Sequence, residues 1–134
     1  DNDVTSYSNY GSNIDILAPG GDSDIGILSL DLLKSDGYNP SSTLSINGNN
    51  LVNENYSFIS GTSFSAPTVS GVIALMLSEN QNLTFDEIRN ILITTTQQVG
   101  LENQADYSVN YFDTKRAYGK IDATKAIEGA IDAL

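Results

Sequence analysis

The chain has 134 residues, of which 6 are Lys or Arg and 17 are Asp or Glu, so its net charge is −11 at pH 7. This length fits one compact domain, and a content of 40% hydrophobic residues predicts a folded core. The acidic charge argues against binding to nucleic acid or an anionic membrane surface. Because there is no Cys and no His, disulfides, thiol catalysis and an imidazole base within this chain are excluded.

The first half of the sequence predicts short strands joined by polar turns. Residues 14–18 alternate in polarity and end at a Pro-Gly-Gly turn, which is typical of a strand followed by a sharp bend. Residues 28–33 contain four leucines and predict a second strand. The Ser, Asn and Gly content of residues 35–53 predicts an exposed loop, and residues 56–59 alternate as a third strand.

A long helix is predicted from Ser63 to Ser78, a stretch without a charged side chain. Its apolar residues fall on every face of a 3.6-residue repeat, which indicates a central helix buried on all sides. Pro67 is expected in the first turn, where a missing N–H has no cost.

Two further helices are predicted after this one. Thr84 and Glu87 form the pattern of a capping box at the start of the first, in which each side chain satisfies the other residue's backbone N–H. Asp122 is expected to cap the last helix, whose apolar residues recur at helical spacing.

Residues 60–67, Ser-Gly-Thr-Ser-Phe-Ser-Ala-Pro, carry the clearest suggestion of chemistry. A strand that turns through Gly61 into a helix places the Ser63 hydroxyl at the helix N-terminus. There, free N–H groups and the positive end of the helix dipole favour a developing oxyanion. The alternative from the local pattern alone is an ordinary serine that caps a helix.

Three separated blocks resemble the subtilisin-like serine proteases. Residues 60–67 are similar to the block around that family's catalytic serine. Residues 8–11 (SNYG) and 15–20 (DILAPG) resemble its strand and turn upstream, and residues 118–123 (YGKIDA) resemble its closing segment before the last helix. Because the blocks occur in the family's order, the chain is identified as a member over roughly residues 6 to 130.

The resemblance implies an α/β, subtilisin-like fold with a mostly parallel sheet and a buried helix that starts at the nucleophile. Residues 1–134 would be the C-terminal portion of a single peptidase domain. Ser63 aligns with the nucleophile of an acyl-enzyme mechanism, and its own N–H is expected to be one arm of the oxyanion hole. Thr62 would assist there, and Gly61 aligns with the wall of the substrate pocket. The implied enzyme is a serine endopeptidase that acts on peptides or proteins and is secreted or held at a bacterial cell surface.

The sequence departs from the family in one respect that decides the mechanism. The family's Asp, His and oxyanion Asn precede the serine, and none can be assigned here. The expected partner is therefore an N-terminal fragment of the same protease that supplies all three, and this chain alone is predicted to be inactive. The start at Asp1, in a polar and turn-prone segment, suggests cleavage by the protease itself or a relative.

Three alternatives remain open at this point. A Ser-Lys dyad would use Ser63 with one of four lysines, Lys34, Lys115, Lys120 or Lys125. A sedolisin-type peptidase has a similar serine block but uses Glu and Asp. A non-catalytic subtilisin-like subunit would keep Ser63 only as a helix cap.

Two loop aspartates are candidate metal ligands. Asp22 and Asp24 could offer oxygens to a structural calcium ion, although Ca²⁺ takes six or more oxygens and no complete loop is visible. No cofactor is expected to be required. The turn at residues 18–22 also resembles that of proteases which remove the leader from a bacterial peptide, so a dedicated processing role is a further hypothesis.

Overall fold

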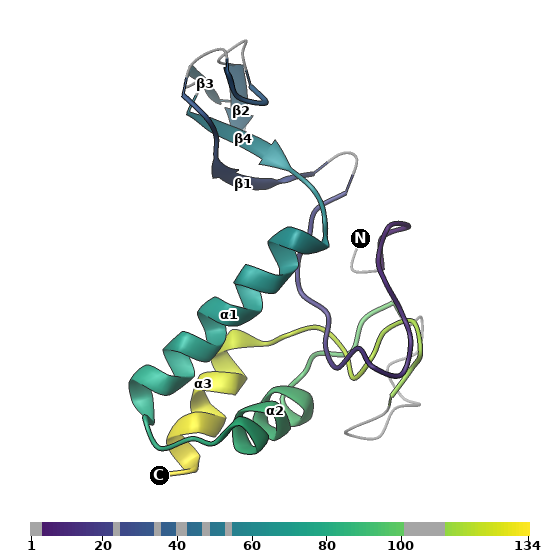
Figure 1. Ribbon diagram of the computed structural model, residues 1–134, viewed down its shortest axis with the longest axis vertical. Coiled ribbons are helices and arrows are strands. Elements are labelled where there is room, and N and C mark those ends of the chain that lie inside the picture. Colours follow the sequence, from purple (N-terminus) through teal and green to yellow (C-terminus); the bar gives the residue numbers. More distant parts are fainter. Residues whose placement is uncertain are drawn as a thin grey trace. The chain divides into compact units, whose positions relative to one another are not determined.

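The computed structural model describes residues 4–22, 25–33, 36–39, 43–46, 49–52, 55–100 and 112–134. The chain divides into two compact units, one formed by residues 1–19 with 62–134 and the other by residues 20–61. Along the chain the elements are β1 (Ile27–Leu30), β2 (Thr43–Ile46), β3 (Asn49–Val52), β4 (Tyr56–Ile59), α1 (Thr62–Glu79), α2 (Phe85–Thr94) and α3 (Ala123–Asp132) (Figure 1).

The unit of residues 20–61 consists of two antiparallel strand pairs. β1 pairs with β4, so that Leu28 lies opposite Phe58 and Leu30 lies opposite Tyr56. These four side chains share one face of the pair and are exposed, whereas Ser57 on the other face is buried. The strand predicted at residues 56–59 is confirmed at the same residues, and the one predicted at 28–33 is formed over Ile27–Leu30.

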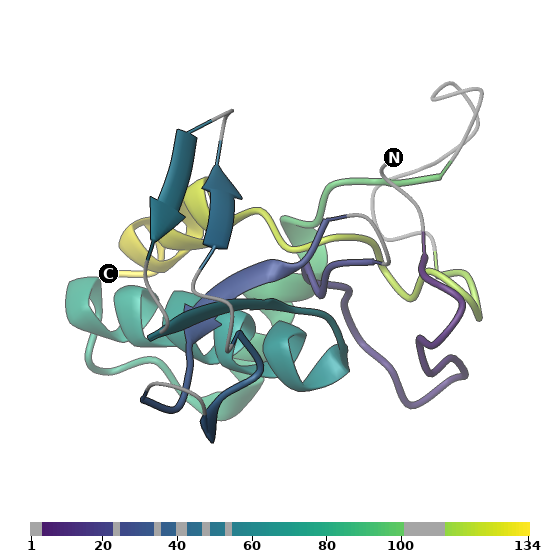
Figure 2. The same ribbon diagram turned by 90° about the horizontal axis from the view of Figure 1, so that it is seen from above.

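The exposed loop predicted over residues 35–53 is wrong in part. β2 and β3 lie within it and pair antiparallel, with Thr43 opposite Val52 and Ile46 opposite Asn49 (Figure 2). The overlooked signal is the pair Asn47-Gly48 between the two segments, because Asn-Gly is the dipeptide that two-residue hairpins favour. The polar composition concealed a hairpin because both segments are short.

The mostly parallel sheet expected from the resemblance is not formed by the described residues, whose paired strands are antiparallel. The strand predicted at residues 14–18 is reduced to one parallel bridge between Leu17 and Lys120. There Leu17 N donates to Gly119 O at 2.8 Å, and Ile121 N donates to Leu17 O at 2.8 Å. Gln97 bridges the other side of Lys120. A longer parallel strand needs a neighbour along its whole length, and the described residues offer it only at this point.

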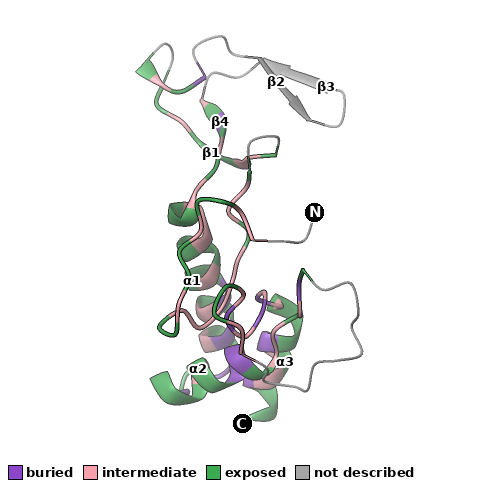
Figure 3. Cartoon of the chain, turned by 90° about the vertical axis from the view of Figure 1, so that its right-hand side faces the viewer, coloured by how far each residue is buried: buried purple, intermediate pink, exposed green. Residues whose placement is uncertain are grey.

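The core of the other unit lies where the three helices meet. Met76 of α1 is completely buried, as are Ala126 and Ala130 of α3 (Figure 3). The small side chains of α3 allow close packing. A Cβ added to Gly129 would lie 2.8 Å from Ile91 Cγ2 of α2.

Both predicted helix caps are confirmed. Thr84 Oγ1 accepts from Glu87 N at 3.4 Å, and Glu87 Oε2 accepts from Thr84 N at 2.8 Å, which completes the capping box of α2. Backbone and side-chain hydrogen bonds from Thr84 lower the pKa of Glu87. Asp122 Oδ1 accepts from Lys125 N at 3.1 Å and caps α3.

The prediction that α1 is buried on all sides is wrong for this chain. Val72 and Met76 are buried against α3, but Leu75 is 52% exposed. The other exposed positions between Ala66 and Ser78 carry small or polar side chains, namely Ala66, Pro67, Thr68, Ser70, Gly71, Ala74 and Ser78. No charged side chain precedes Glu79 in the helix, and the described residues provide a neighbour for only part of its circumference.

Candidate active site

Thr62 and Ser63 are the first two residues of α1, and both are exposed. The first four N–H groups of a helix have no partner within the helix, so the Ser63 N–H is available to an incoming oxygen. The first turn contains no acidic side chain that would oppose a negative charge there. This position suits a nucleophile whose oxyanion is stabilised by a helix N-terminus.

The Ser63 hydroxyl makes no hydrogen bond to any residue that the structure describes. It is therefore not a cap, unlike Thr84 and Asp122, whose side chains accept from backbone N–H groups at the start of α2 and α3. It also has no base beside it among those residues. A serine in this state has its ordinary, weak nucleophilicity.

Gly61 leads the chain into α1 with a φ of +149°, a value that side chains disfavour. Its N–H donates to Gly20 O at 2.8 Å. One residue earlier, Ser60 Oγ donates to Asp22 O at 2.6 Å. Sequence reasoning missed the role of Ser60, because its partner is 38 residues away and no local pattern indicates that contact.

Pro67 is the sixth residue of α1 and not in the first turn as predicted, because the helix begins at Thr62 and continues through it. A proline at this position cannot donate to the carbonyl four residues earlier, which is that of Ser63. The Thr68 hydroxyl donates to Phe64 O at 2.9 Å, adding a bond one residue further along. The turn that carries Ser63 thus lacks one regular helical hydrogen bond.

The described residues do not assemble a calcium site. The Asp22 carboxylate already accepts from Ile25 N at 2.7 Å, and Asp24 lies outside the described residues. Among those residues there is no group of three or more His, Cys, Asp or Glu side chains that could hold a metal ion. One carboxylate falls far short of the six to eight oxygens that Ca²⁺ takes.

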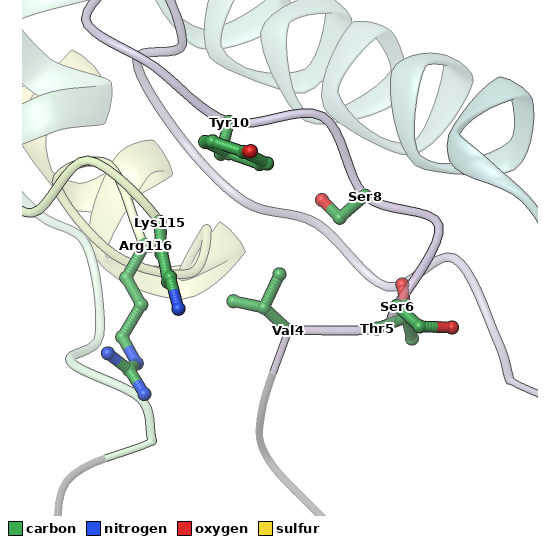
Figure 4. A pocket seen from close by; sticks show the side chains of 7 residues that line it. All are labelled: Val4, Thr5, Ser6, Ser8, Tyr10, Lys115 and Arg116. Atoms are coloured by element: carbon green, nitrogen blue, oxygen red, sulfur yellow. The ribbon is translucent and has the colours of Figure 1, made fainter.

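A cavity of about 280 Å³ lies elsewhere in the same unit, and Ser63 and Thr62 are not among its lining residues. Lys115 and Tyr10 project toward it from two different segments (Figure 4). Its full lining is Val4, Thr5, Ser6, Ser8, Tyr10, Lys115 and Arg116.

Lys34 lies outside the described residues, and the other three lysines of the proposed dyad make no hydrogen bond to Ser63. The geometry gives the Ser-Lys dyad no support.

An ion pair holds the segment that precedes the Ala-Pro-Gly turn. Arg89 of α2 donates to both carboxylate oxygens of Asp15, at 2.6 and 3.0 Å. The side-chain hydrogen bond and the charge of Asp15 raise the pKa of Arg89. The motif identified Asp15 but gave no indication of its partner, which is 74 residues away.

Comparison with known proteins decides the family. The model of the Subtilase family matches residues 1–122. The chain belongs to the subtilase family. The resemblance of the three sequence blocks is thereby confirmed.

Several subtilase relatives are similar over nearly all of this chain. Halolysin of Haloferax mediterranei is 33% identical over 127 residues, covering 95% of this chain and 18% of the relative. The calcium-dependent protease of Nostoc sp. is 32% identical over 134 residues, covering 96% of this chain and 20% of the relative. The chain therefore spans about a fifth of the length of these subtilases.

Solved structures agree at the level of the fold. The serine protease of Aeromonas sobria superposes with a TM-score of 0.75 at 24% identity, covering 96% of this chain and 27% of that one. The same protease in complex with its chaperone gives a TM-score of 0.73 at 22% identity, covering 98% and 28%. The described residues are thus part of a subtilisin-like α/β fold. None of their helices is long and apolar enough to cross a membrane.

Proposed function

We propose that this chain is the C-terminal portion of a subtilisin-like serine endopeptidase domain and carries its nucleophile, Ser63. The observation that carries the proposal is the exposed Ser63 at the second position of α1, without a hydrogen-bond partner among the described residues, in a member of the subtilase family. The part of the peptidase upstream of residue 1, called the upstream chain below, supplies Asp, His and the oxyanion Asn. This chain together with that upstream chain is called the complete peptidase below.

In the complete peptidase, Ser63 Oγ attacks the carbonyl carbon of the scissile peptide bond while the upstream His takes its proton. The Asp holds that His in the correct tautomer. The oxyanion accepts hydrogen bonds from the Ser63 N–H and the upstream Asn, and Thr62 assists at the same helix end. The C–N bond then breaks as the His protonates the leaving amine, which leaves an acyl group on Ser63. Water hydrolyses this ester by the same route in reverse.

The exposed face of α1 supports an upstream partner. A Cβ added to Gly71 would meet nothing within 4 Å in the part of the chain that the structure describes. A glycine inside a helix costs roughly 0.5–1 kcal/mol relative to alanine, so its presence needs a reason that the described residues do not supply. Close approach of another backbone is such a reason. We infer that the upstream chain covers this face and that its strands extend the parallel pairing begun at Leu17 and Lys120.

The finer properties are proposed by analogy with named relatives. The relative from Natrialba magadii is named an extracellular serine protease, which supports a secreted or cell-surface location here. The Nostoc relative is named a calcium-dependent protease, which supports the proposal that this peptidase also binds a structural calcium ion. Its ligands would have to include residues other than Asp22. Substrates are peptides or proteins, and removal of a bacterial leader peptide is the most specific role suggested by the turn at residues 18–22. The subtilase match favours the Asp-His-Ser arrangement over the sedolisin-type one.

Reconstitution tests the proposal. Residues 1–134 are expected to hydrolyse no peptide alone, and addition of the upstream chain should restore hydrolysis. Ser63→Ala should abolish the restored activity. The matched control is Ser78→Ala, which removes a hydroxyl from the last turn of the same helix and should leave activity unchanged. Activity of the wild-type chain alone, or full activity of the Ser63→Ala complex, would contradict the proposal.

A further inference from the structure

The backbone that enters α1 is held by two consecutive residues. Ser60 Oγ donates to Asp22 O at 2.6 Å, and Gly61 N donates to Gly20 O at 2.8 Å. Both acceptors belong to the turn that follows Pro19, so the two ends of the unit formed by residues 20–61 are bound to each other. The segment between Asp22 and Ser60, which are 38 positions apart, is thereby closed at its base.

Close packing reinforces these two hydrogen bonds. A Cβ on Gly21 would lie 2.7 Å from Ser60 Oγ and 2.9 Å from Ile25 O, and the φ of Gly21 is +75°. A Cβ on Gly26 would lie 2.9 Å from Ile59 N. Glycines therefore occur where the two backbone segments approach too closely for a side chain. The Ser60 hydroxyl fits between these segments and donates its hydrogen bond to Asp22 O.

We propose that Ser60 is a positioning residue for the nucleophile, acting through the backbone that leads from Ser60 through Gly61 to Ser63. The Ser60 bond fixes the residue before Gly61, and the Gly61 N–H bond fixes the peptide between them. The inference rests on the proposed function of Ser63.

The effect of such a restraint falls on rate more than on folding. A reacting atom displaced by about 1 Å can lose about 10²-fold in rate, because proximity and orientation supply much of the catalysis. Ser60 is exposed, and loss of one exposed hydrogen bond changes global stability little. Removal of the hydroxyl should therefore lower kcat and the reactivity of Ser63 while KM and Tm stay close to those of the wild type.

The test uses the complete peptidase and a fluorophosphonate, which forms a bond to an activated serine. The rate of Ser63 phosphonylation, kcat, KM and Tm are measured for the wild type, Ser60→Ala and Ser60→Thr. Ser60→Ala is expected to slow phosphonylation and kcat by about tenfold. Ser60→Thr keeps the hydroxyl and should restore both. Ser78→Ala, which removes a hydroxyl-to-carbonyl bond of the same 2.6 Å length at the other end of α1, should react as fast as the wild type.

Gly21→Ala is a second variant that leaves the Ser60 hydroxyl present but crowds it, and it should also slow phosphonylation. The inference is overturned if Ser60→Ala reacts at the wild-type rate. It is also overturned if threonine fails to restore the rate, or if the loss simply follows a fall in Tm that is shared by Ser78→Ala. A wild-type peptidase that is not phosphonylated at all would overturn the proposed function, and the inference with it.

Discussion

Substitution of Gly71 by alanine tests whether another chain covers α1. In residues 1–134 alone the new methyl group meets no described residue within 4 Å, so only the helical preference for alanine acts. The change should stabilise α1 by roughly 0.5–1 kcal/mol, because glycine has the larger conformational entropy to lose. Circular dichroism should show more helix, and hydrogen exchange of the α1 amides should slow.

In the complete peptidase the same substitution should have the opposite sign. If the backbone of the upstream chain packs on Gly71, the methyl group overpacks that contact at a cost of about 1–3 kcal/mol. After the gain in helical preference of roughly 0.5–1 kcal/mol is deducted, a net loss of up to about 2.5 kcal/mol remains. Denaturant unfolding of the complete peptidase, with the midpoint compared at constant m-value, measures this loss.

The matched control is Gly129→Ala. Gly129 lies within α3 and packs against α2 of the same chain. Its Cβ would lie 2.8 Å from Ile91 Cγ2 within this chain, so it should destabilise both the chain alone and the complete peptidase. If Gly71→Ala stabilised the complete peptidase as much as the chain alone, the face around Gly71 would be open in both. The inference that the upstream chain covers it would then be refuted.

Three further outcomes are expected. Ser63→Ala should leave the free energy of unfolding of the complete peptidase within about 0.5 kcal/mol of the wild type while abolishing hydrolysis, because the hydroxyl makes no capping bond to the described residues; a large loss of stability in denaturant unfolding would point to a structural role. Met76→Ala should lower the free energy of unfolding of the unit that contains the three helices by about 2–5 kcal/mol, since that side chain is completely buried. A loss below about 1 kcal/mol would refute the packing described. Because Thr84 lowers the pKa of Glu87, the capping box stabilises α2 above the unfolded-state pKa of this carboxyl, and the contribution is lost as the pH falls through the lowered value. Glu87→Gln should remove that acidic pH dependence from the thermal unfolding of the protein, whereas an unchanged profile would exclude Glu87 as its source.

Local sequence patterns predicted the parts of the structure that depend on neighbouring residues. The capping box of Thr84 and Glu87 and the cap at Asp122 involve contacts within three residues, so their signatures were sufficient. β4 was predicted at the correct residues because aromatic and polar side chains alternate there. The candidate site was proposed in the same way, from a strand, a glycine and a helix start, and its residues stay a prediction.

The remaining features depend on contacts between distant residues. The bond from Ser60 to Asp22 and the ion pair of Arg89 with Asp15 have no local signature. The apolar repeat of α1 predicted burial on all sides, which is wrong for the described residues, and it carries no information on what would cover the exposed face. Composition also obscured β2 and β3, since short polar strands resemble a loop until their pairing is known.

The most direct test of the central claim is mass-spectrometric mapping of the fluorophosphonate adduct on the complete peptidase. The account predicts a single adduct on the fragment that contains Ser63, and no adduct on residues 1–134 alone, because the upstream His is needed to activate the hydroxyl. An adduct on another serine, or labelling of the isolated chain at the rate of the complete peptidase, would contradict the assignment of Ser63 as a nucleophile activated by a second chain.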